Sequence, residues 1–142
     1  MEFYLTAYSY LKGRGLNINR KFLRIRMQSH PDYPSLISLT DSLDELGISF
    51  NAIQAEKKLY RDLQYPLLAH IVNSQTVEFK QIESALFFEK NRDVFEHWNG
   101  IVFSTEHSGR LIFNKEYSSF EEKKKRFTVY CYLFFFYFLH FI

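Results

Sequence analysis

Apolar residues near the N-terminus and in residues 35–47 recur at the spacing of helix faces. The first set predicts a helix that ends at Gly13 or Gly15, and its members are Phe3, Tyr4, Ala7, Tyr8 and Leu11. The second set predicts a helix capped by Ser35 or Asp32 and ended by Gly47. Its apolar positions are Leu36, Leu39, Leu43 and Leu46. Both helices are expected to bury one side in a core.

A further helix is predicted between these two. It begins at Asn17 or Asn19, either of which can cap it, and it stops before His30-Pro31, because a residue that precedes proline is pushed away from helical geometry. Its buried side is predicted to contain Ile18, Phe22, Ile25 and Met27.

After Gly47 the pattern changes to short apolar runs separated by turn residues, which is typical of antiparallel strands. Strands are predicted over 48–52, 67–72, 77–82, 85–88 and 101–104, with a charged helical turn or loop over 56–65 and one helical turn over 93–98. Helices that precede antiparallel strands predict an α+β domain, over residues 1–105.

The C-terminal residues 127–142, FTVYCYLFFFYFLHFI, contain no Lys, Arg, Asp or Glu, although charged residues make up 24% of the chain. As a helix they would rise about 24 Å, and a bilayer core is about 30 Å thick. Four cations, Lys123–Arg126, stand at the start of this run and end a polar stretch, 106–126, which we interpret as a linker. The run is predicted to be a transmembrane segment, or the first part of a longer one, with the preceding domain on the cytoplasmic side. A C-terminal core helix or strand is the alternative.

The candidate chemistry is sparse. Cys131 is the one cysteine, which excludes an internal disulfide, a CxxC redox pair and a four-cysteine zinc site. The histidines outside the tail show no metal-binding spacing, and neither GxSxG nor a glycine-rich phosphate loop occurs. We therefore predict no metal site and no cofactor. The formal net charge of +2 on 142 residues also disfavours a nucleic-acid partner.

Positive charge is concentrated near the N-terminus, where residues 1–30 carry six cations and one anion, for a net charge of +5. Four of the cations, Arg20, Lys21, Arg24 and Arg26, belong to the second predicted helix. They are candidates for contact with anionic lipid head groups or with a peptide. The alternative is a solvated helix face.

The stretch HPDYPSL, residues 30–36, predicts a rigid corner, because each proline fixes one backbone angle and Asp32 or Ser35 can cap the next helix. His30 and Asp32 could form an acid–base pair, but no nucleophile accompanies them.

The chain resembles the family of bacteriocin-processing, double-glycine leader peptidases, which are papain-like cysteine peptidase domains found in front of membrane exporters. The similar stretches are HPDYPSLISLTDSLDELGI (30–48), YPLLAHI (65–71), VEFKQI (77–82) and VFEHWNGIV (94–102), and their order covers roughly residues 3–105. The resemblance is closest to the subgroup fused to a membrane domain of the vitamin K epoxide reductase type, and it implies a papain-like fold.

The catalytic residues of that family are missing at the matching positions. The nucleophilic cysteine would fall near Met1 or Glu2, and Glu78 stands where the histidine is expected. The aspartate that orients the histidine has no counterpart in 84–91. A thiol nucleophile needs a base, and the base needs an orienting group. We therefore predict no catalytic residue in this chain.

The resemblance and its departures together predict a non-catalytic, peptidase-like domain tethered to a membrane. It would serve as a peptide-recognition or accessory module for a peptide export system or a membrane thiol oxidoreductase. Two alternatives remain open: an active peptidase that cleaves double-glycine leaders, and a truncated structural remnant of a membrane oxidoreductase.

Overall fold

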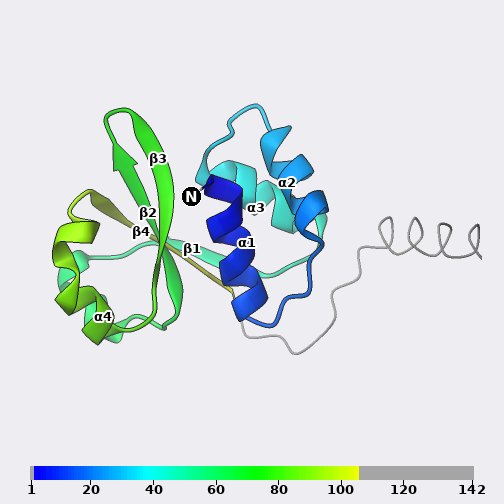
Figure 1. The fold of residues 1–142 in the computed structure, drawn as a ribbon. Coiled ribbons are helices and arrows are strands. Elements are labelled where there is room, and N and C mark those ends of the chain that lie inside the picture. Colours follow the sequence, from blue (N-terminus) through cyan, green and yellow to red (C-terminus); the bar gives the residue numbers. More distant parts are fainter. Residues whose placement is uncertain (1, 106–142) are drawn as a thin grey trace, which may run out of the picture. The chain divides into compact units, whose positions relative to one another are not determined.

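The computed structural model describes residues 2–105, in which helices come first and an antiparallel sheet follows (Figure 1). The helices are α1 (Phe3–Gly13), α2 (Arg20–Gln28), α3 (Leu36–Glu45) and α4 (Ala85–Lys90), with short 3-10 helices η1 (Lys57–Asp62) and η2 (Arg92–Phe95). The strands are β1 (Phe50–Gln54), β2 (Leu67–Asn73), β3 (Thr76–Ile82) and β4 (Trp98–Thr105). The α+β class is confirmed.

The predicted linker 106–126, the predicted transmembrane segment 127–142 and Cys131 lie outside the described residues. Over residues 2–105, no helix has both the length and the apolar character that crossing a bilayer requires.

Two predicted helix caps are present. The Asn19 side chain accepts a hydrogen bond from the Phe22 amide at 2.9 Å and starts α2. Ser35 starts α3 through a reciprocal pair of bonds with Ser38. Gly47 ends α3 with a φ of 68°, a left-handed conformation that costs glycine little.

One residue of α2 that was predicted to lie in the core is exposed. Ile25 is 51% exposed, whereas Leu23 and Met27 are fully buried. Residues four apart share one side of a helix, so the pair 23 and 27 sets the buried side and Ile25 points away from it. Not every apolar residue of α2 is therefore buried in the core.

The four strands form one sheet in the order β1-β4-β2-β3, and every pair is antiparallel. β2 and β3 form a hairpin closed at Asn73 and Thr76. The predicted strand over 85–88 is wrong, because this run is helix α4. Its start is capped by Ser84, whose hydroxyl accepts from the Phe87 amide at 3.1 Å. A short apolar run fits a strand or a buried helix turn equally well, and here the Ser84 cap favours the helix.

The sheet carries an apolar cluster on each face. Leu68, Phe79 and Phe103 pack with the three N-terminal helices in the helix-side cluster. Leu67, Ala69, Ile71, Ile82 and Val102 pack with the segment that contains α4 and η2, in the α4-side cluster. Successive residues of a strand point to opposite faces, which explains why neighbours in β2 belong to different clusters.

Candidate functional site

The start of α1 lies against β3, and aromatic rings fill the contact. Phe3, the first residue of α1, stacks on Phe79 of β3 with 4.3 Å between ring centroids. Tyr33 meets Phe3 edge to face at 5.8 Å. Phe3 and Phe79 are both buried. The junction between helix start and strand is therefore an apolar contact, and neither ring can act as a nucleophile or a base.

Glu78 lies on β3, next to Phe79 in sequence. Its register partner is Ile71, which belongs to the α4-side cluster, and its carboxylate pairs with Lys80 Nζ at 3.3 Å. The assignment of Glu78 to the histidine position stays a prediction. The pleat places Phe79, rather than Glu78, on the face that α1 covers.

His70 is the imidazole nearest to this junction. It is the register partner of Phe79, and the two ring centroids lie 5.8 Å apart. His70 Nδ1 lies 3.1 Å from Asn99 Nδ2. Burial lowers the pKa of His70 below its ordinary value, and the hydrogen bond with Asn99 opposes that shift. The neutral imidazole is therefore favoured in the folded chain.

A bulge in β4 brings Asn99 to His70. The register between β2 and β4 shifts between the pairs Ala69–Val102 and Ile71–Trp98. Gly100 has a φ of 86°, and a Cβ there would lie 2.6 Å from the carbonyl oxygen of Ala55. This position therefore requires glycine.

The sequence predicted a helical turn over 93–98, which ends before Asn99-Gly100, and it gave no link between Asn99 and His70. The two positions are 29 residues apart. The bulge could have been predicted from the Asn-Gly pair itself, which directly precedes the predicted strand 101–104.

A hollow of about 450 Å³ runs along β3, and we call it the β3 groove. In the order β1-β4-β2-β3, strand β3 has β2 as its one neighbour in the described sheet, so its outer backbone edge has no ladder partner there. Figure 1 shows β3 between α1 and the segment that contains α4. The groove is lined by Thr6 and Ser9 of α1, by residues 78–81 of β3, and by Phe87, Val94 and Phe95.

The four predicted contact cations lie on α2, away from the β3 groove. Arg20, Lys21 and Arg24 are exposed, whereas Arg26 forms an ion pair with Glu45 of α3 at 3.0 Å. No residue of α2 lines the groove within the described residues. A single ligand in the groove would therefore not be held by these cations.

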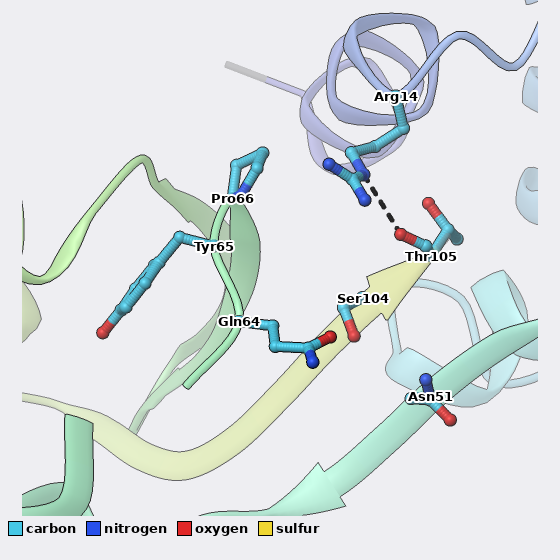
Figure 2. Close-up of a pocket in the computed structure, with 7 residues that line it drawn as sticks. All are labelled: Arg14, Asn51, Gln64, Tyr65, Pro66, Ser104 and Thr105. Atoms are coloured by element: carbon cyan, nitrogen blue, oxygen red, sulfur yellow. Dashed lines mark hydrogen bonds between the residues drawn. The ribbon is translucent and has the colours of Figure 1, made fainter. Parts of the chain in front are cut away.

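A second hollow, of about 420 Å³, lies beyond the C-terminal end of α1, and we call it the Arg14 pocket (Figure 2). Arg14 is the C-cap residue of α1, and its Nε donates to the carbonyl oxygen of Thr105 at 3.0 Å. Nearby, the Tyr10 hydroxyl donates to the carbonyl of Pro66 at 3.1 Å and accepts from the Thr105 amide at 3.2 Å. These bonds tie the end of α1 to Pro66, which directly precedes β2, and to the end of β4. The pocket was not predicted from the sequence.

His30 has a structural role at the corner before α3. Its Nε2 lies 3.0 Å from the carboxylate of Asp41, and its Nδ1 accepts from the Asp32 amide at 3.1 Å. The carboxylate of Asp32 is farther from the ring, at 4.0 Å. Among the described residues no cluster of three or more His, Cys, Asp or Glu could hold a metal ion.

No protein-family model matches the sequence, and no curated protein matches it. Among solved structures, the chain is similar to the peptidase domain of Streptococcus ComA, described as a bi-functional ABC transporter involved in a quorum-sensing pathway. The match has 16% identity and a TM-score of 0.48, and it covers 74% of this chain and 88% of that domain.

Proposed function

We propose that this chain is a papain-like domain that recognises peptides without hydrolysing them. The observation that carries the proposal is the stack of Phe3 on Phe79, 4.3 Å apart, where the start of α1 meets β3. By the sequence resemblance, the nucleophile of the related peptidases is expected near Met1 or Glu2, at that helix start. Two phenylalanine rings can neither attack a carbonyl nor take a proton from a nucleophile.

The β3 groove supports the recognition part of the proposal. An extended peptide can add to an open sheet edge through main-chain hydrogen bonds, while its alternate side chains enter flanking pockets. β3 offers such an edge, and Phe87 and Val94, both partly exposed, form an apolar wall beside it. We therefore assign the β3 groove to an extended peptide with apolar side chains.

Attachment to a membrane is the second part of the proposal. It is motivated by the apolar run 127–142 and the cations Lys123–Arg126. The exposed cations Arg20, Lys21 and Arg24 would add attraction to an anionic cytoplasmic surface. In this arrangement a peptide passing to an exporter or a membrane oxidoreductase would meet the domain beside the bilayer.

One incubation separates the proposal from its enzymatic alternative. The full chain, in detergent, is mixed with a double-glycine leader peptide, and the mixture is followed by fluorescence anisotropy and mass spectrometry. We expect saturable binding and an intact peptide after prolonged incubation. Cleavage behind the glycine pair that persists through purification would establish a peptidase, and its loss in Glu78→Ala would identify the base. A complete lack of binding would remove the recognition role.

A further inference from the structure

We propose that the Arg14 pocket binds the free carboxylate of a small ligand, such as an acylated amino acid or a peptide C-terminus. This pocket lies at the end of α1, whereas the β3 groove and the Phe3–Phe79 stack involve its first turns and β3. The inference therefore does not rest on the proposed function.

The charge of the pocket favours an anion. Its lining consists of Arg14, Asn51, Gln64, Tyr65, Pro66, Ser104 and Thr105, so that it contains one cation and no acidic residue. The one hydrogen bond of the Arg14 side chain in the described part of the chain runs from Nε to Thr105. Both terminal nitrogens of the guanidinium thus remain available. A guanidinium matches a planar carboxylate with two parallel hydrogen bonds.

Polar side chains from three further segments complete the pocket. Figure 2 shows the Gln64 amide pointing toward Ser104, below the guanidinium of Arg14. The amide of Asn51 and the hydroxyl of Ser104 can also donate hydrogen bonds to a carboxylate oxygen.

The remaining lining limits the ligand. Pro66 forms one side of the pocket and offers apolar contact to a side chain, whereas the ring of Tyr65 points away from the other lining residues (Figure 2) and packs against the α4-side cluster. The volume of about 420 Å³ is near the lower end for small-molecule sites, about 300–1,000 Å³. A single terminal residue with its carboxylate fits this size better than a long polyanion.

The test compares two ligands that differ only in the terminal group. The full chain is titrated by calorimetry with N-acetyl-phenylalanine and with its amide. We expect the acid to bind at least tenfold more tightly, and Arg14→Gln to remove this preference. Arg24→Gln, which removes an exposed cation on α2, is the matched control and should bind as the wild type does. Equal affinities for acid and amide would overturn the proposal.

Two further measurements complete the test. Because Arg14→Gln could unfold the end of α1, Gln64→Ala serves as a milder variant at an exposed position, and it should weaken binding several-fold. Inorganic phosphate at equal concentration should not displace the acid, and displacement would contradict a carboxylate site.

Discussion

The two hollows of this domain are built in opposite ways. The β3 groove has an apolar wall and a bare backbone edge, and its ring Phe79 belongs to the helix-side core. The Arg14 pocket is lined mostly by polar side chains, which come from surface positions and strand ends. A substitution at Phe79 in the groove would therefore also remove core packing. The polar side chains of the pocket can be substituted one at a time without disturbing the core.

The largest expected effect is a loss of stability when Phe79 of the β3 groove is replaced. Phe79→Ala removes a buried ring that stacks on Phe3, and it should lower the free energy of unfolding by about 3–5 kcal/mol. The matched change in the pocket, Ser104→Ala, should cost about 0.5 kcal/mol or less. Urea denaturation of both variants measures the difference, and comparable losses would show that the groove is not built on the core.

Gly100→Ala is expected to have the next largest effect. Alanine disfavours a φ of 86°, and its Cβ would lie 2.6 Å from the carbonyl oxygen of Ala55. The strain should cost about 1–3 kcal/mol. It should also disturb the contact between His70 and Asn99, seen as shifted His70 ring signals in NMR spectra. Gly13→Ala, with open space around the added methyl, is the control and should be nearly neutral.

Two equally exposed valines sharpen the assignment of the groove. Val94 lines the β3 groove and is 42% exposed, whereas Val72 is 43% exposed and does not line it. Val94→Asp places a charge in the apolar wall and should weaken leader-peptide binding about tenfold, or about 1.4 kcal/mol. Val72→Asp should leave the affinity unchanged. Equal losses in both variants would move the binding site elsewhere.

The smallest expected effect is a dependence on pH. Burial holds the pKa of His70 below its ordinary value of 6.5, so the folded state favours the neutral ring. The stability gained in this way is present above pH 6.5 and is lost as the pH falls through the folded pKa.

Between pH 7 and pH 5, the melting temperature of the wild type should fall more than that of His70→Gln. This window lies above the range in which Glu89 titrates, because the hydrogen bonds from Tyr60 and Arg61 lower its pKa below 4.5. Parallel curves for the two proteins would contradict the burial of His70.

The helical half of the fold could be predicted because its signals are local. Asn19, Ser35 and Gly47 each mark a helix end through their own side chain or backbone preference. The run 85–88 was wrongly predicted as a strand, because four apolar residues fit a strand and a helix turn equally well. Ile25 was misplaced because the buried side of α2 is set by its partners α1 and α3.

The candidate sites could be predicted only in part. The resemblance pointed to β3, but the open edge depends on strand order, which no local pattern encodes. The contact of His70 with Asn99 depends on the bulge at Gly100, and the Arg14 pocket joins residues 91 positions apart. These features arise from tertiary pairing rather than from motifs.

The central claim is that a peptide binds along β3, and hydrogen–deuterium exchange tests it most directly. The full chain is labelled with and without a saturating double-glycine leader peptide. A peptide that pairs with the open edge should slow exchange of the backbone amides in residues 77–81, with little change in α2. Unchanged exchange in β3, with protection confined to α2, would contradict the account.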